Sequence, residues 1–415
     1  MLYIDQPVQT GFSYDTLVNG TINQIHSPLD ITVEDFSISG VPTVNNTFLV
    51  GTFPSTNPLN TASLTTTAAF SAWQFMQTWT QDIWTESYGG HYGPTFANFF
   101  EDQNDRIENG EIKSPATKLH LDTLGIGNGC IDIESQISAY PQMAFNNTYG
   151  LQLMTEAEYQ SALSSYPKYQ SLIESCRSAE ASSALSETAA AACSEAYGFC
   201  FKTMWATYNE HGRNVFDIGL PLISSWSPKF AAGYLNQAEV QQALGVPLNF
   251  TGLSTGVASA FDATGDFARG GNLKALGSLL DRGVKVALMY GDKDYQCNWL
   301  GGENASLHIP STLSAGFRSA GYASLDTNST YSGGFVRQYG YLSFTRVFNA
   351  GHEVPWYQPE TAYQIFTRAM LGTDIATSTI PLGSGEEYKT EGPQSCFSVK
   401  TQVAEKRERV CYLWV

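Results

Sequence analysis

Residues 83–94 show the pattern that most restricts how this chain can fold. A short apolar run ends at Trp84, a serine follows at Ser87, and two glycines lead into a helix-like pattern. This order of strand, sharp turn and helix is typical of a nucleophile elbow, which holds a serine in a strained backbone conformation with its hydroxyl in the open. Thr85 replaces the first glycine of the minimal G-x-S-x-G pattern, so this segment alone does not distinguish a nucleophile from a serine in a glycine-rich loop.

An acid and a histidine occur later in the chain, each directly after an expected strand. The apolar, β-branched run Val284–Tyr290 is followed by Asp292 and Asp294. The alternating run Tyr341–Phe348 is followed by a Gly-His turn at His352. In α/β sheets, catalytic groups lie beyond the carboxyl ends of the strands. The order serine, acid, histidine is that of the α/β-hydrolases, so the three segments together indicate acyl-transfer chemistry.

Five segments of the chain carry recognisable motifs: Asp5–Tyr14, Glu86–Gly90, Gly291–Asp294 with Cys297 and Asn298, Ala350–His352, and Tyr234–Asn236 with Val240 and Ala243–Val246. Together they resemble the signature blocks of the serine carboxypeptidases. They occur in the family's order between Leu2 and about Thr377. The resemblance implies an α/β fold, namely an α/β-hydrolase sheet with a helical lid insertion.

The resemblance implies roles for four residues of the expected site. Ser87 would attack a substrate carbonyl, His352 would take up and return the proton, and Asp294 would orient and stabilise the imidazolium. The backbone N–H of Tyr88, the residue after the nucleophile, would be one oxyanion donor. Asp292, the other acid of its segment, is expected to be a turn or strand-end residue.

Glu86 directly precedes the expected nucleophile, and in the family this residue helps to bind the C-terminal carboxylate of the substrate. Two carboxyl groups share a hydrogen bond only when one of them is protonated. The role therefore implies a raised pKa of Glu86 and an acidic working pH, whereas the alternative is an exposed acid in a loop. Cys297, beside the acid segment, is expected to be a small packed hydrophobic residue rather than a reactive thiol.

Some features depart from the family's pattern. The family has a Trp-Leu-Asn-Gly-Gly-Pro-Gly block that supplies a second oxyanion N–H, and this chain has none. Only residues 80–82 separate the expected helix Thr66–Trp79 from Ile83, where the family has a longer loop. We therefore expect an incomplete chain in which the first strands of the sheet are missing. The family commonly has glycine at the positions of Gln9 and Thr85, and often methionine at the position of Glu353.

The pattern of strands and helices divides the chain into four parts. Residues 1–130 and 226–380 are expected to form the two parts of the hydrolase core, and residues 381–415 a polar C-terminal tail. Residues 131–225 are expected to form a helical lid insertion, or else a surface insertion without a role. Within them, Thr155 and Glu158 form a capping-box pattern that predicts the start of a helix. Expected core elements are the strands Leu2–Ile4, Ile83–Thr85 and Leu119–Gly125 and the helix His91–Phe100.

Composition and charge exclude several classes of protein. The chain has 415 residues, 42% of them hydrophobic, which suffices for a large core in one or two domains. A net charge of −17 argues against a nucleic-acid partner, and no apolar run is long enough for a membrane span. Because no metal-ligand spacing or nucleotide-binding loop occurs, we expect no metal and no cofactor. The composition suits a secreted, vacuolar or lysosomal protein, although the chain shows no signal peptide.

Cysteines and sequons also bear on the compartment. Cys176, Cys193 and Cys200 lie close in sequence and are expected to supply a local disulfide in an oxidising compartment, with the pairing left open. The total of seven cysteines is odd, so at least one has no partner within this chain. Six sequons support secretion only weakly, because several would occur by chance. The glycosylation candidates are Asn19, Asn45, Asn146, Asn249, Asn304 and Asn328.

The sequence therefore predicts a serine-type carboxypeptidase that acts at acidic pH on peptides or proteins with a free C-terminus. An acyltransferase or esterase on the same scaffold is the alternative among enzymes, because a fold does not determine a substrate. A catalytically inactive homologue that acts as a binding glycoprotein is the alternative outside enzymes. The intact Ser87, Asp294 and His352 argue against inactivity, and the missing amino-terminal block argues for it. The oligomeric state stays open.

Overall fold

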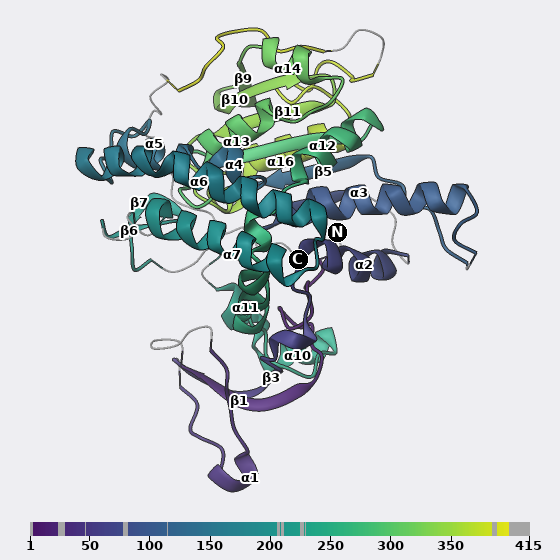
Figure 1. Cartoon of the computed structure of the whole chain (residues 1–415), viewed down its shortest axis with the longest axis vertical. Helices are drawn as coiled ribbons and strands as arrows, with labels where there is room; N and C mark the ends of the chain where they lie inside the picture. Colours follow the sequence, from purple (N-terminus) through teal and green to yellow (C-terminus); the bar gives the residue numbers. More distant parts are fainter. Residues whose placement is uncertain are drawn as a thin grey trace.

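The structure is a computed structural model. It describes residues 3–23, 30–45, 47–77, 82–113, 115–205, 208, 211–224, 228, 230–383 and 388–397. Figure 1 shows a larger part built around one sheet and a smaller part at the lower end. In the ranges given, no helix has both the length and the apolar character that a membrane span needs.

A six-stranded mixed sheet forms the centre of the larger part (Figure 1). The strand order is β4-β5-β8-β11-β10-β9; the first four strands run parallel and the last two pair antiparallel. The carboxyl ends of the four parallel strands therefore meet at one edge, where the chain continues into the elbow, acid and histidine segments. The strands are β4 (Ile83–Glu86), β5 (Thr123–Gly127), β8 (Lys285–Gly291), β9 (Ala323–Asn328), β10 (Tyr331–Tyr339) and β11 (Leu342–Val347).

Alternate residues of β8 enter two separate apolar cores. Val286 and Leu288 belong to the larger core, which also holds residues of α3, α12 and α13. Ala287 and Met289 belong to a smaller core with α16. This alternation is the period of a strand that is buried on both faces, and it places helices on both sides of the sheet. The helices are α3 (Gly89–Glu108), α12 (Asn272–Asp281), α13 (Trp299–Leu307) and α16 (Pro359–Met370).

The described residues between 131 and 224 are mostly helical, and most of their buried apolar side chains join the same large core as the sheet. The capping box of Thr155 and Glu158 starts α6, as the sequence predicts. Helices α6 and α7 lie side by side (Figure 1), linked by the disulfide Cys176–Cys193, so the expected local disulfide is confirmed. The elements are α4 (Ile133–Gln136), α5 (Ala139–Phe145), α6 (Glu156–Ser182), α7 (Glu187–Cys200), the π-helical turn η2 (Phe201–Trp205), β6 (Arg213–Asn214) and β7 (Asp217–Pro221).

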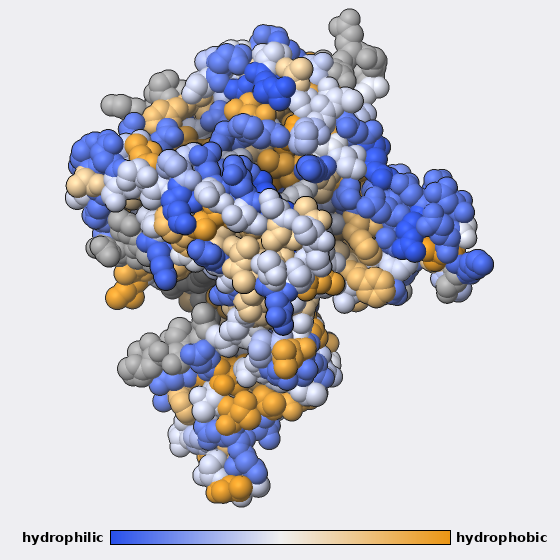
Figure 2. Space-filling view, viewed as in Figure 1, coloured by the Kyte–Doolittle hydropathy of each residue, from blue (hydrophilic) through white to orange (hydrophobic). Residues whose placement is uncertain are grey.

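A three-stranded antiparallel sheet, β2-β1-β3, forms part of the lower end of the molecule (Figure 1). Figure 2 shows apolar patches on this end, where Leu17, Val33 and Ile38 are exposed. In the described ranges these strands do not pair with the six-stranded sheet, although the sequence assigns residues 1–130 to the hydrolase core. The elements at this end are β1 (Leu17–Asn23), β2 (Thr32–Val33), α1 (Phe36–Ser39), β3 (Phe48–Pro54) and α10 (Ala238–Leu244), with α9 (Ala231–Leu235) in contact with α10. Helix α2 (Thr65–Met76) packs against α3, and α11 (Thr255–Thr264) packs against α7.

Two expected strands differ in the structure. The prediction of a strand at Leu2–Ile4 is wrong for Tyr3 and Ile4, which lie in no strand; Leu2 lies outside the described residues. The chain turns back directly afterwards, because the Asp5 carboxylate accepts the backbone N–H of Phe12 at 2.9 Å. Strand β5 begins four residues later than predicted, at Thr123. The reason is that the side chain of Asn104, on α3, binds both the N–H and the carbonyl of Leu119.

Candidate active site

Ser87 occupies the turn between β4 and α3. Its φ of +62° lies in the left-handed region, which residues with side chains rarely adopt. The Ser87 N–H donates to the carbonyl of Gly127 at 3.1 Å, and the Ser87 carbonyl accepts from Gly90 at 2.9 Å and from Cys130 at 3.0 Å. A side chain at Gly90 would place Cβ 2.4 Å from the carbonyl oxygen of Cys130, so this packing needs glycine. The sharp strand-to-helix turn that the sequence predicts is therefore present.

Thr85 stands where the elbow pattern has glycine, and the structure shows how it fits. Its hydroxyl donates to the carbonyl of Gly89 at 2.9 Å. A Cβ at Gly89 would lie 2.5 Å from the Cβ of Thr85, so a glycine on the helix makes room for the threonine on the strand. The replacement leaves the turn itself intact.

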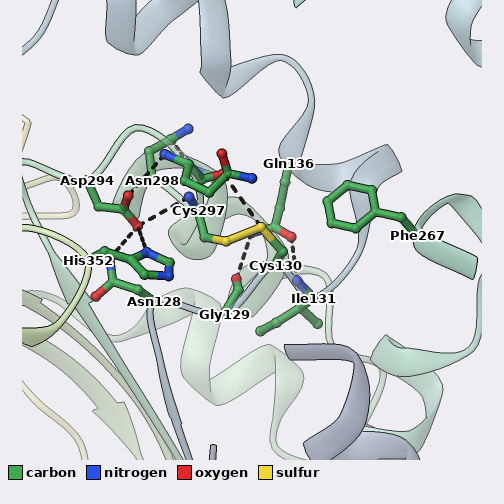
Figure 3. Close-up of a disulfide and its surroundings, with 12 residues drawn as sticks. Asn128, Gly129, Cys130, Ile131, Gln136, Phe267, Asp294, Cys297, Asn298 and His352 are labelled. Carbon is green, nitrogen blue, oxygen red and sulfur yellow. Dashed lines mark hydrogen bonds and ion pairs between the residues drawn. A yellow bond between two sulfur atoms is a disulfide. The ribbon is translucent and has the colours of Figure 1, made fainter. Parts of the chain in front are cut away.

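Asp294 and His352 form a buried pair (Figure 3), since His352 Nδ1 lies 2.7 Å from Asp294 Oδ2 and neither side chain is more than 1% exposed. The Asp294 carboxylate also accepts from the Asn128 amide at 2.8 Å and from the backbone N–H groups of Gln296 at 3.0 Å and Cys297 at 3.2 Å. Hydrogen bonds of this kind hold the acid in place. The acid is thus well placed to orient the imidazole.

The structure does not join Ser87 to His352 by a hydrogen bond. His352 Nε2 is buried, and it has no hydrogen-bond partner among the residues that the structure describes. Catalytic hydrogen bonds are often long in the absence of substrate and tighten when it binds. Of the three expected triad residues, the structure brings Asp294 and His352 together, and it places Ser87 at the same edge of the sheet.

The loops that hold the acid and the histidine bind the last part of the helical insertion. The His352 N–H donates to the carbonyl of Phe216 at 2.8 Å, and the N–H groups of Tyr295 and Gln296 donate to the carbonyl of Val215 at 3.0 and 2.9 Å. The Phe216 ring also lies 5.0 Å from the imidazole. The hairpin formed by β6 and β7 therefore supports both loops from one side.

Asp292 lies at the end of β8 in a separate buried ion pair. Its carboxylate is 3.0 Å from the Arg346 guanidinium, and neither side chain is exposed to solvent. Asp292 also accepts the backbone N–H of Asn349 at 2.9 Å, and Arg346 lies 4.4 Å from the ring of Trp299. This arrangement anchors the chain just before the histidine turn, which fits the strand-end role that the sequence predicts.

Acidic side chains surround the imidazole. Burial lowers the pKa of His352, but the charge and hydrogen bond of Asp294, with the charges of Glu86 and Glu353, outweigh it and raise that pKa to about 9. Glu86 keeps an exposed surface, yet the protein around it removes much of its hydration. This desolvation raises the pKa of Glu86 to about 7, against the attraction of His352. Burial likewise raises the pKa of Glu353.

Tyr88 immediately follows Ser87 and precedes the first residue of α3. No hydrogen bond uses its backbone N–H within the described part of the chain. Its side-chain hydroxyl donates to Asp266 at 2.8 Å, and its ring packs against His91 and Phe261. The side chain is held firmly, which leaves the N–H available as a donor at the start of a helix, where such groups bind anionic oxygens.

Cys297 forms a disulfide with Cys130 (Figure 3), so its prediction as a packed free cysteine is wrong. The two cysteines are 167 residues apart, and only the neighbouring positions of β5 and β8 bring them together. The sequence prediction also did not include Asn128, whose amide binds Asp294. A usable signal was present, because Asn128-Gly129-Cys130 directly follows a buried strand in the parallel sheet.

The six sequons differ in how the fold places them. Asn45 is exposed, and its side-chain oxygen accepts from both the N–H and the hydroxyl of Thr47 at 2.9 Å. Asn304 is only partly exposed, and its amide nitrogen donates to the carbonyl of Ser135. Of the other candidates, Asn249 is partly exposed and the rest are exposed, namely Asn19, Asn146 and Asn328.

Comparisons with known proteins agree with these observations. The family model described as serine carboxypeptidase matches residues 1–372. Carboxypeptidase S1 homolog A of Arthroderma otae is 43% identical over 438 residues, which cover 100% of this chain and 67% of that protein. The Carboxypeptidase Y homolog of Arthroderma benhamiae is 40% identical over 420 residues, which cover 94% of this chain and 66% of that protein.

A solved structure shows the same fold. The crystal structure of Kex1(delta)p, a prohormone-processing carboxypeptidase from Saccharomyces cerevisiae, matches with a TM-score of 0.57 over 81% of this chain and 72% of that chain. At 19% identity, this likeness supports the fold alone. It confirms the predicted α/β class. The family match over residues 1–372 and the identities of 40% and more show that the chain belongs to the serine carboxypeptidase family.

Proposed function

We propose that this protein is a serine-type carboxypeptidase that hydrolyses the last peptide bond of substrates with a free C-terminus. The proposal rests mainly on the buried Asp294–His352 pair at the same sheet edge as the strained Ser87. Family membership supports the hydrolase chemistry. Glu86, directly before the serine and with a raised pKa, supports recognition of the substrate carboxylate.

The first half of the reaction would cleave the peptide bond. Ser87 Oγ attacks the carbonyl carbon, and its proton passes to His352 Nε2. Asp294 stabilises the imidazolium, and the Tyr88 N–H donates to the oxyanion. The imidazolium then gives its proton to the leaving nitrogen, the C–N bond breaks, and the C-terminal amino acid leaves. Ser87 retains the rest of the substrate as an ester.

The second half would restore the enzyme. A water molecule attacks the ester carbonyl while His352 Nε2 takes one of its protons. When the tetrahedral intermediate collapses, the imidazolium returns that proton to Ser87 Oγ and the shortened peptide leaves with a new carboxyl group. The net reaction consumes one peptide bond and one water molecule, and the enzyme is unchanged. An acceptor alcohol or amine in place of water would make the same site an acyltransferase.

Glu86 would make hydrolysis of free-acid substrates favour acidic pH. As a neutral acid it can donate to the substrate's C-terminal carboxylate, and its pKa of about 7 means that this form grows as the pH falls through that value. His352 must be neutral to act as a base. Protonated Glu86 and Glu353 no longer carry the charges that raise the pKa of His352, so acidification of these two groups partly offsets protonation of the imidazole.

A chemical probe and a matched substrate set test the proposal. A fluorophosphonate should label Ser87, and Ser87→Ala should lower kcat on the order of a million-fold, because triad members act as a unit. An N-blocked dipeptide acid should lose its last residue faster than the corresponding amide. Labelling of another serine, with Ser87 untouched, would overturn the assignment of the nucleophile. Rapid ester hydrolysis without release of C-terminal residues would instead favour an esterase.

An oxidising compartment fits this function. Two disulfides form in the described residues, and disulfides persist in secreted and vacuolar proteins rather than in the cytosol. We therefore place the protein's work outside the cytosol, in a secreted or in a vacuolar or lysosomal setting.

A further inference from the structure

We propose that the Cys130–Cys297 disulfide is a positioning link that holds the nucleophile and the acid of the site in register, so that full activity requires it to be oxidised. The inference rests on the proposed function, because it assigns Ser87 and Asp294 their roles. The disulfide lies beside the Asp294–His352 pair (Figure 3).

Cys130 is tied directly to the nucleophile turn. Its backbone N–H donates to the carbonyl of Ser87 at 3.0 Å. Its own carbonyl accepts from His91 Nδ1 at 2.6 Å, and His91 lies in the first turn of the helix that follows the serine. A displacement of Cys130 would therefore move both ends of the elbow, where the backbone is already strained at Ser87.

Cys297 is tied directly to the acid. Its backbone N–H donates to Asp294 Oδ2 at 3.2 Å, the same oxygen that binds His352. The next residue, Asn298, caps helix α13 by accepting from the N–H of Gly301 at 3.0 Å. Cys297 therefore lies between the acid and a helix end, and its position helps to set the orientation of the carboxylate.

The link acts where the sheet no longer holds the chain. The last ladder pairs between β5 and β8 end at Gly127 and Met289, and both cysteines lie beyond them in loops. Across this gap Asn128 contributes hydrogen bonds through one side chain, and the disulfide contributes the covalent connection. A shift of about 1 Å in a catalytic group can cost on the order of 100-fold in rate, so a covalent bond that limits such shifts at this point should affect the rate.

Burial protects the link. Cys130 is 4% exposed and Cys297 is 1% exposed, so a reductant reaches the sulfurs only when the loops open. A dithiol such as dithiothreitol would break the S–S bond by exchange and become a cyclic disulfide. Its two electrons and two protons would leave thiols on Cys130 and Cys297. Substitution is therefore the cleaner test, and the disulfide Cys176–Cys193 supplies a matched control within the same chain.

The experiment compares the full chain with C130A/C297A and with C176A/C193A, each secreted under oxidising conditions. At a temperature well below both melting points, C130A/C297A should lose about 10- to 100-fold in kcat on a blocked ester, with little change in KM. C176A/C193A should keep kcat within about twofold and lose only thermal stability. The charge and hydrogen bond of Asp294 raise the pKa of His352, so a less firmly held Asp294 should lower that pKa. The acidic side of the profile of kcat against pH should therefore move to lower pH in C130A/C297A alone.

Each outcome decides between the link and the proposed function. If C130A/C297A folds and matches the full chain in kcat and pH profile, the positioning role is wrong. Free thiols at Cys130 and Cys297 in the active protein, detected by alkylation and peptide mapping, would overturn it as well. If neither double variant folds, partial reduction of the full chain should lower activity in step with the reduced fraction of Cys130, not of Cys176. A full chain that neither hydrolyses substrate nor labels at Ser87 would contradict the proposed function instead.

Discussion

The side-chain amide of Asn128 donates at 2.8 Å to Asp294 Oδ2, the same oxygen that accepts from His352 Nδ1. The side-chain oxygen of Asn128, Oδ1, accepts from the backbone N–H of Gly291 at 2.9 Å, so one side chain joins the ends of β5 and β8. Asn128 has a φ of +38°, a region that asparagine tolerates better than most residues. Asn128 therefore binds the backbone of β8 at Gly291 and also holds the carboxylate of Asp294.

Asn128→Asp should separate these two roles. The new carboxylate still accepts from Gly291 but repels Asp294, so we expect a loss of about 10- to 100-fold in kcat near neutral pH. As the pH falls, the introduced acid becomes protonated and can donate again, so the loss should shrink. Asn128→Ala is the control, since its loss should not recover at low pH. Profiles of kcat against pH that run parallel for the two variants would contradict the proposed bond to Asp294.

The ratio of kcat/KM for a free-acid peptide to that for its amide should isolate Glu86. Both substrates need neutral His352, so its titration cancels in the ratio. The pKa of Glu86 is raised to about 7, so the neutral form that binds a carboxylate is lost as pH rises through that value, and the ratio should fall there. Glu86→Gln keeps a donor at every pH and should flatten the ratio. If the ratio in the unmodified protein does not depend on pH, Glu86 does not bind the carboxylate.

Removal of one partner of the Asp292–Arg346 pair should destabilise the fold. Asp292→Ala leaves an uncompensated charge that the structure buries completely, which typically costs about 3–5 kcal/mol in free energy of unfolding. Urea unfolding would measure the loss. The double variant Asp292→Ala/Arg346→Met should lose less than the sum of the single variants, because no lone charge remains buried. Additive losses would show that the two charges do not interact.

Only some sequons should accept a glycan when the protein passes through a eukaryotic secretory pathway. Asn45 is exposed and should be modified. Asn304 donates its amide nitrogen, the atom that a glycan would occupy, to Ser135 on the neighbouring α4 segment, and should stay bare. Glycopeptide mass spectrometry would read both sites. Asn45→Gln should remove one glycan mass and Asn304→Gln none, and a glycan on Asn304 in folded protein would contradict this placement.

Local signals in the sequence predicted the parts of the fold that depend on local chemistry. The capping box at Thr155 needs only residues within one turn, and it starts α6 as expected. The segments after β4, β8 and β11 lie at one edge because parallel strands share their direction. The order of strands was therefore enough to predict that Ser87, Asp294 and His352 lie at the same edge of the sheet.

Relations between distant segments were less accessible. The pairing of Cys130 with Cys297 depends on β5 lying next to β8, which no local pattern states. The start of β5 depends on Asn104, whose side chain binds Leu119 from helix α3, outside the strand. The charged surroundings of His352 likewise come from separate segments, so the size of its pKa shift required the structure.

The hairpin formed by β6 and β7 has a consequence for how this scaffold can be re-engineered. The helices before it are the obvious piece to exchange in a chimera, but the carbonyls of Val215 and Phe216 hold the acid loop and the histidine loop. An exchange that runs through residue 225 would remove those two acceptors along with the helices. The upstream helices and the hairpin are therefore separate design units, and a graft should rejoin the host chain before Arg213.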